Sequence, residues 1–157
     1  MSQQNRSFGA LPLVGKAALV VGAVFLVVGI LGFIPGITTH YGGMKFAGHM
    51  SEAKLLGLFN VSILHNIVHL LFGLAGIALA RNPVTARGYL LGGGVIYLVL
   101  WLYGLVIDQH GSANFIPVNT ADNWLHLLLG LGMIALGFAT TRGGAGAPAG
   151  PAPRGTR

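Results

Sequence analysis

Two stretches of the chain place histidine and asparagine inside otherwise apolar sequence. The first, LHNIVHLLFGLAGIALA, covers residues 64–80, and the second, NWLHLLLGLGMIALG, begins at Asn123. Polar groups are costly inside a membrane, so residues of this kind usually pair with one another or serve a function. Imidazole can ligate haem iron, bind a metal ion or carry a proton near neutral pH. The two stretches therefore contain the candidate functional site.

The spacing of these residues predicts one polar stripe on each helix, because positions three and four apart are neighbours on a helix. The first stripe comprises Ser62, His65, Asn66, His69 and Gly73, and the second comprises Asn123, His126 and Gly130. Small residues let helices approach closely in lipid, and polar ones hydrogen-bond across the contact. We therefore predict that both stripes face the bundle interior and each other. A face of residues 88–107 that includes Tyr97 is expected to complete the wall of a cavity.

A b-type haem is the sharpest cofactor hypothesis for this site. His69 and His126 are the matched pair that could ligate the iron from facing helices, as happens in other four-helix bundles. Gly73 and Gly130 lie one turn further along the same faces, where a missing side chain could admit the edge of the porphyrin. Against this hypothesis, the apolar runs contain no arginine or lysine that could meet the haem propionates.

Two further interpretations use the same residues. His65 and His69 stand at positions i and i+4, a spacing that lets two imidazoles reach one ion such as copper or zinc, with His126 as a third ligand. Alternatively the polar residues are structural, with His69 bonded to Asn123 and His126 bonded to Asn66 across the bundle. A proton-coupled carrier is a weaker alternative. The C-terminal half of each of these two helices is lined by glycine, alanine and leucine, so it offers no polar groups that could pass a proton on.

Enzymatic catalysis is not expected. The chain has no cysteine, which excludes thiolate catalysis, disulfides and cysteine-ligated clusters. Ser62 lies near histidines, but no acid on the same stripe would orient a base and no G-x-S-x-G turn is present. The sequence therefore favours a structural or accessory membrane protein without catalytic residues.

Four apolar runs must position the polar stripes. Apolar residues make up 54% of the 157 residues and charged residues only 8%, against about a quarter charged in soluble domains. The predicted spans are residues 17–37, 55–80, 88–107 and 123–141, each near the roughly 20 residues that cross a bilayer. Residues 1–16 precede them, and the basic Gly/Ala/Pro-rich tail at 142–157 is expected to be disordered. The predicted fold class is an all-α bundle of four transmembrane helices.

The basic residues predict the direction of these spans. Seven of the nine lie on one side, namely Arg6, Lys16, Arg81, Arg87, Arg142, Arg154 and Arg157, and only Lys45 and Lys54 lie on the other. The positive-inside rule then places both termini in the cytoplasm. The net charge of +6 is explained by this pattern and does not indicate nucleic-acid binding. The histidines fall in the middle or outer half of their spans.

The two stretches also predict an internal repeat. With Asn66 aligned to Asn123, nine of fifteen residues are identical. Because both helices run in the same direction, the chain is expected to form two parallel helical hairpins related by a pseudo-twofold axis along the membrane normal. Glycine-rich faces on the first and third spans would suit a homodimer or a membrane-protein partner.

The loops on the outer side are expected to cap and cover the stripes. Ser51 is predicted to cap a short helical start to the second span, and Thr120 or Asp122 to cap the fourth. Phe115, Ile116 and Pro117 are expected to dip back onto the bundle and form a lid over the histidines.

The motifs LLGLFNVSILHNIVHLLFGLAGIALAR, YLLGGGVIYLVLWLYGLV and ANFIPVNTADNWLHLLLGLGMIALG together resemble a family of small four-pass bacterial membrane proteins, the domain of unknown function 4383. The resemblance covers about residues 15 to 140. It implies the four-helix architecture and implies no activity. The expected function is thus an integral membrane protein that is structural or accessory to a partner, with an outward-facing haem or metal site as the alternative.

Overall fold

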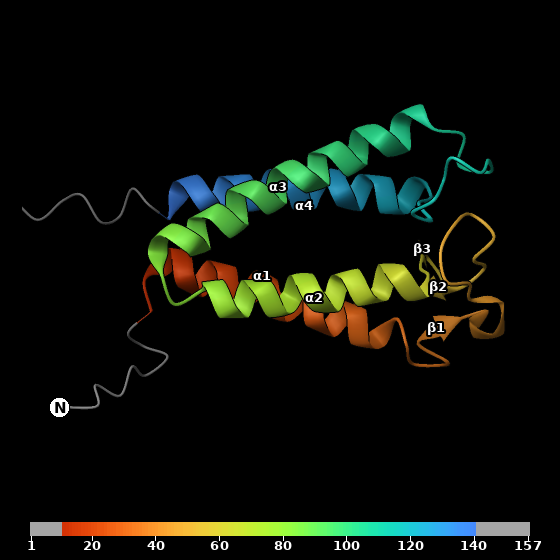
Figure 1. The fold of residues 1–157 in the computed structure, drawn as a ribbon, viewed down its shortest axis with the longest axis horizontal. Helices are drawn as coiled ribbons and strands as arrows, with labels where there is room; N and C mark the ends of the chain where they lie inside the picture. Colours follow the sequence, from red (N-terminus) through yellow and green to blue (C-terminus); the bar gives the residue numbers. More distant parts are fainter. Residues whose placement is uncertain (1–10, 141–157) are drawn as a thin grey trace, which may run out of the picture.

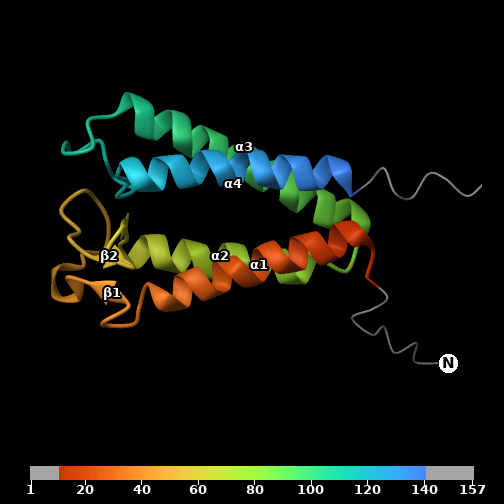
Figure 2. The same ribbon diagram turned by 180° about the vertical axis from the view of Figure 1, so that it is seen from behind.

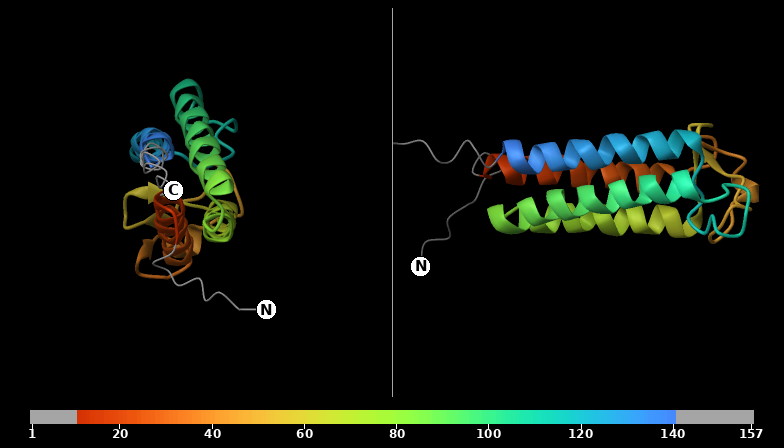
Figure 3. Two further views of the ribbon diagram at one scale, coloured as in Figure 1. Left: turned by 90° about the vertical axis from the view of Figure 1, so that its left-hand side faces the viewer. Right: turned by 90° about the horizontal axis from the view of Figure 1, so that it is seen from above.

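Four helices form two hairpins in the computed structural model, which describes residues 11–140. They are α1 (Leu13–Leu31), α2 (Ile63–Leu79), α3 (Pro83–Val106) and α4 (Thr120–Ala139). Helix α1 packs mainly against α2, and α3 mainly against α4 (Figures 1 and 2). The start of α1, the α2–α3 connection and the end of α4 lie at one end of the bundle, here called the turn end (Figure 3). The predicted all-α bundle is confirmed. The predicted tail at 142–157 and residues 1–10 lie outside the described residues.

A small antiparallel sheet lies at the opposite end, here called the sheet end (Figure 1). Its strands are β1 (Thr38–Thr39), β2 (Lys54–Leu55) and β3 (Phe59–Asn60), in the order β1-β2-β3, and a short 3₁₀ helix η2 (Tyr41–Gly43) follows β1. Residues 55–62, which the sequence assigns to the second span, therefore form strands and a turn. Leu56 and Gly57 have φ angles of 53° and 72°, which a right-handed helix does not allow.

The helix caps differ from those predicted. The side chain of Ser62 caps α2 and accepts a hydrogen bond from the His65 amide, while Ser51 is buried and donates to the Val61 carbonyl at 2.6 Å. Helix α4 begins with a capping box. The Asn119 side chain accepts a hydrogen bond from the Asp122 amide, and the Asp122 side chain accepts one from the Asn119 amide. Helix α3 begins at Pro83 behind an Asn82 cap, which is the favoured place for proline in a helix. Helices α1, α3 and α4 accordingly begin before the apolar runs that predict them.

The outer faces of the helices suit lipid. Helices α1, α3 and α4 are long and apolar enough to cross a membrane, and α2 is an apolar helix of 17 residues. Large apolar side chains such as Val20, Leu71 and Leu128 point outward and are more than half exposed. Soluble monomers rarely expose apolar surface on this scale. The helices are therefore those of a membrane-compatible bundle.

Within each hairpin the two helices touch backbone to backbone through glycines. A Cβ atom on Gly73 would lie 2.7 Å from the carbonyl oxygen of Gly22, and one on Gly94 would lie 2.8 Å from that of Gly130. Between the hairpins the contact is aromatic instead. The ring of Phe25 lies 5.4 Å from that of Tyr97, and the ring of Phe72 lies 4.9 Å from that of Tyr89. The hairpins are thus tightly packed units joined by larger side chains.

Candidate functional site

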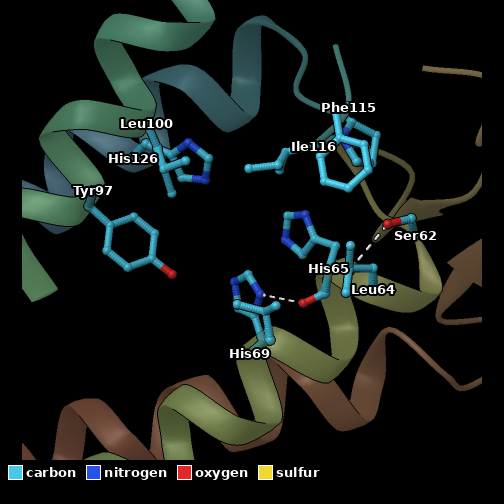
Figure 4. A pocket seen from close by; sticks show the side chains of 11 residues that line it. Ser62, Leu64, His65, His69, Tyr97, Leu100, Phe115, Ile116 and His126 are labelled. Carbon is cyan, nitrogen blue, oxygen red and sulfur yellow. Dashed lines mark hydrogen bonds between the residues drawn. The ribbon is translucent and has the colours of Figure 1, made fainter. Parts of the chain in front are cut away.

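A cavity of about 200 Å³ lies between the two hairpins near the sheet end. Its wall comes from α2, α3, α4 and the loop before α4, and Figure 4 shows the imidazole rings and the Tyr97 side chain around a common space. The lining residues are Ser62, Leu64, His65, Val68, His69, Tyr97, Leu100, Phe115, Ile116, Pro117 and His126. All three histidines predicted within the spans therefore line one cavity, together with the predicted wall residue Tyr97 and the predicted lid residues.

The two histidines of α2 form a stacked pair. The rings of His65 and His69 lie 4.3 Å apart at an interplanar angle of 7°. Nδ1 of His69 lies 2.9 Å from the backbone carbonyl oxygen of His65. Because a carbonyl oxygen only accepts, Nδ1 of His69 must donate, and Nε2 of the neutral ring is then left as an acceptor.

His126 approaches the same cavity from α4. It is 4% exposed, and its ring stands edge-on to that of Tyr97 at 5.3 Å. Within residues 11–140, Nδ1 of His126 and Nδ1 of His65 have no hydrogen-bond partner. Buried polar atoms are nearly always bonded to protein, water or ligand. Both atoms are also inaccessible to solvent, so a guest in the cavity would meet the other ring nitrogen, Nε2, of His65 and of His126.

Asn66 and Asn123 lie in the same stripes but do not line the cavity. Each carboxamide fills the space beside a glycine of its own hairpin, Asn66 beside Gly32 and Asn123 beside Gly104. Among the residues that the structure describes, neither the His69–Asn123 nor the His126–Asn66 hydrogen bond of the structural hypothesis is formed. The amides instead occupy the contact between the two helices of a hairpin.

Gly73 and Gly130 likewise face their own hairpins. A side chain on Gly73 would meet Leu26 of α1, and one on Gly130 would meet Leu98 of α3. Neither glycine lines the cavity, so the space predicted for a porphyrin edge is filled by leucine. The volume of about 200 Å³ is also below the roughly 300–1,000 Å³ of cofactor sites. These residues do not fit a haem.

The imidazoles also do not converge on one point. Across residues 11–140, no group of three or more His, Asp or Glu side chains could hold a metal ion. His65 and His69 are stacked face to face, whereas ligands to one ion point their nitrogens at it. The three histidines thus share a cavity without forming a ready metal centre.

The loop before α4 is held over the cavity by hydrogen bonds that the sequence analysis did not identify. Asn114 is buried, and its amide nitrogen donates to the carbonyls of Gln109 and Val118 at 2.8 and 3.0 Å. The carbonyl of Phe115 accepts from the amide of Gly48 at 2.8 Å, which joins the two outer loops. Asn114 lies in a Gly/Ser/Asn segment typical of turns, and that signal could have predicted its local role.

A second link joins the hairpins at the rim of the sheet end. One carboxylate oxygen of Asp122 accepts hydrogen bonds from the amides of Asn60 and Asn119, both at 3.0 Å. The side-chain amide of Asn119 donates to the carbonyl of Leu58 at 2.8 Å. Asp122 is therefore a structural acceptor that connects α4 to β3, and it is absent from the cavity wall.

Comparison with known proteins identifies one family. No curated protein and no solved structure matches the chain. The sequence profile of one family, the domain of unknown function DUF4383, matches residues 16–139. That match spans nearly all of the described helices and carries no assigned activity. The chain belongs to the DUF4383 family.

Proposed function

We propose that this chain is a non-catalytic, four-span membrane protein whose two hairpins enclose a binding site for a small uncharged molecule on the outer side of the membrane. The observation that carries the proposal is the apolar cavity between the hairpins, with three imidazoles on its wall. No acid stands among the lining residues to orient a base, so binding is favoured over general-base catalysis.

Matched contacts support the proposal that the hairpins are repeats. Phe25 of α1 lies 5.4 Å from His69 of α2, and Tyr97 of α3 lies 5.3 Å from His126 of α4. The glycine contact between Gly22 and Gly73 matches that between Gly94 and Gly130. The caps Ser62 and Asn119 stand at equivalent places in α2 and α4. A cavity on the pseudo-twofold axis would be lined by corresponding helices of the two hairpins.

The proposed direction places the sheet end outside. Lys16, Arg81 and Arg87 lie at or near the turn end, and the positive-inside rule assigns that end to the cytoplasm. Helix α2 has 17 residues, or about 26 Å of helix. That length is close to the thickness of the hydrocarbon core. Helix α2 is therefore assigned to the membrane as well, which brings the proposed number of spans to four.

Cysteine labelling in intact cells tests this direction, since the natural chain has no cysteine. We expect Phe115→Cys, at the cavity rim, to react with a membrane-impermeant maleimide before lysis. Val84→Cys, which is exposed at the turn end, should react only after lysis. The change in gel mobility on labelling measures the labelled fraction of each variant before and after lysis. Labelling of Val84→Cys alone in intact cells would reverse the orientation.

A small aromatic probe tests the cavity itself. An apolar cavity of about 150 Å³ is large enough to bind benzene, so fluorobenzene should bind the purified full chain saturably. Fluorine NMR in detergent would follow the bound fraction. Leu100→Trp fills the cavity and should abolish the saturable part, leaving only partition into micelles. An unchanged saturable signal in Leu100→Trp would show that binding occurs elsewhere.

A further inference from the structure

We propose that the natural guest of this cavity is the ring of a phenol or quinol, held by its hydroxyl groups between the histidines of the two hairpins. This inference rests on the proposed function and names its ligand class. It concerns binding only, and it draws on the size, polarity, ring content and access of the cavity.

The size and charge of the cavity select a small neutral molecule. The volume of about 200 Å³ exceeds the 150 Å³ that accepts one benzene ring and leaves room for a few substituents. No aspartate, glutamate, lysine or arginine lines it. A charged guest would have to leave water without an opposite charge to meet it, which is strongly unfavourable.

The hydrogen-bonding groups of the wall select a hydroxyl donor. His69 donates through Nδ1 to the His65 carbonyl, so its Nε2 can only accept while the ring is neutral. His126 reaches the cavity from the opposite hairpin, and its Nε2 is the ring nitrogen available to a guest because its Nδ1 is enclosed by protein. A ring with hydroxyl groups on opposite sides would engage one imidazole from each hairpin. A simple hydrocarbon would leave both nitrogens unsatisfied at a cost.

The rings around the cavity select a planar guest. Tyr97, Phe115 and the stacked pair of His65 and His69 all contribute rings to the wall, and Figure 4 shows the labelled rings surrounding the open space. Aromatic rings pack best against other rings, in offset or edge-to-face contacts. A phenolic O–H is also more acidic than that of an aliphatic alcohol, which strengthens its bond to a neutral imidazole.

The access side of the cavity is apolar. Val68 and Phe115 line the cavity and are 50% and 57% exposed, so these two side chains belong both to the cavity wall and to the outer surface. Val68 lies in the apolar helix α2, beside the surface that suits lipid. A guest can therefore reach the cavity from the bilayer, and a hydrocarbon tail on the ring could remain in the lipid.

The test measures binding of trimethylhydroquinone to the full chain in lipid nanodiscs by calorimetry. Its dimethyl ether is the matched ligand, because it keeps the ring and loses both donors. We expect the ether to bind about five- to 150-fold more weakly, the range for losing two neutral hydrogen bonds. His69→Phe, which keeps a ring and removes one of the two bonds, should weaken quinol binding about two- to twelvefold and leave ether binding unchanged. His110→Phe is the control, since His110 is exposed and outside the cavity.

Each remaining outcome has a defined meaning. If the quinol and the ether bind equally well and neither binds Leu100→Trp, the inference that hydroxyl groups are recognised is overturned. The proposed binding function of the cavity would still stand. If neither ligand nor fluorobenzene binds the unmodified chain, the cavity function itself is wrong. Val68→Trp, at the open side, provides a second blocking variant if Leu100→Trp does not fold. A quinol with an isoprenoid tail that binds more tightly than trimethylhydroquinone would identify the membrane as the source.

Discussion

Replacing Gly73 with leucine is expected to remove at least about 3 kcal/mol of the free energy of unfolding, at the upper end of overpacking costs. A Cβ at this position would lie 2.7 Å from the Gly22 carbonyl oxygen and 2.7 Å from the Leu26 backbone nitrogen. These are backbone atoms, so no side-chain rotation relieves the clash. Helices α1 and α2 would have to separate along their length. Unfolding of the purified protein in mixed detergent and denaturant measures the change.

Gly132→Leu is the matched control for this prediction. Gly132 also lies within a helix, α4, but nothing lies within 4 Å of a Cβ built there. Leucine has a higher helix propensity than glycine by less than about 1 kcal/mol, and its side chain would enter lipid. We therefore expect a small change in stability or a gain. If Gly73→Leu and Gly132→Leu are equally stable, α1 and α2 do not pack through Gly22 and Gly73.

Asp122→Ala is expected to cost about 2–5 kcal/mol, because two backbone donors lose their acceptor at once. Asp122 is 3% exposed and accepts from the amides of Asn60 and Asn119 at 3.0 Å. The first bond crosses between the hairpins and the second completes the cap of α4. Hydrogen exchange of peptides that contain Asn60 and Asn119 should accelerate, in addition to the loss in unfolding free energy.

Two substitutions separate this effect from a general loss of negative charge. Asp122→Asn keeps an oxygen that can accept both bonds, so most of the stability should return. Asp108→Ala removes an exposed carboxylate that accepts from the nearby His110 amide, and an exposed local contact is worth about 1 kcal/mol or less. A loss in Asp108→Ala equal to that in Asp122→Ala would contradict the role assigned to the buried carboxylate.

Much of the fold could be predicted because the signals are local. The length of the apolar runs predicts helices, and the steps of three and four predict the stripes of α2 and α4. The boundaries were less predictable, because the side chains of Ser62, Asn82 and Asn119 cap α2, α3 and α4 and set where these helices begin. The strands β2 and β3 lie in the sequence KLLGLFN, which is apolar apart from Lys54 and Asn60. Only the turn at Leu56 and Gly57 distinguishes them from the helix.

The candidate site shows where local signals end. The sequence brings His65, His69 and His126 to helix faces that meet at one cavity, and it anticipates Tyr97 and residues 115–117 in the wall. The sequence does not show that Asn66 and Gly73 differ from the cavity-lining residues. They share the stripe of His69, yet they pack between the two helices of their own hairpin.

What the sequence alone determined is the set of helices, their apolar faces and the membership of each stripe, since these follow from residue type and helical period. Tertiary structure decided which residues of each stripe contact the partner helix of the same hairpin and which face the other hairpin. A helix in this bundle touches its hairpin partner and the other hairpin on adjoining sides. The glycines and asparagines go to the partner, where backbones approach within contact distance. The histidines go to the wider gap between the hairpins, where the cavity lies. That choice depends on packing distances, which no helical period encodes.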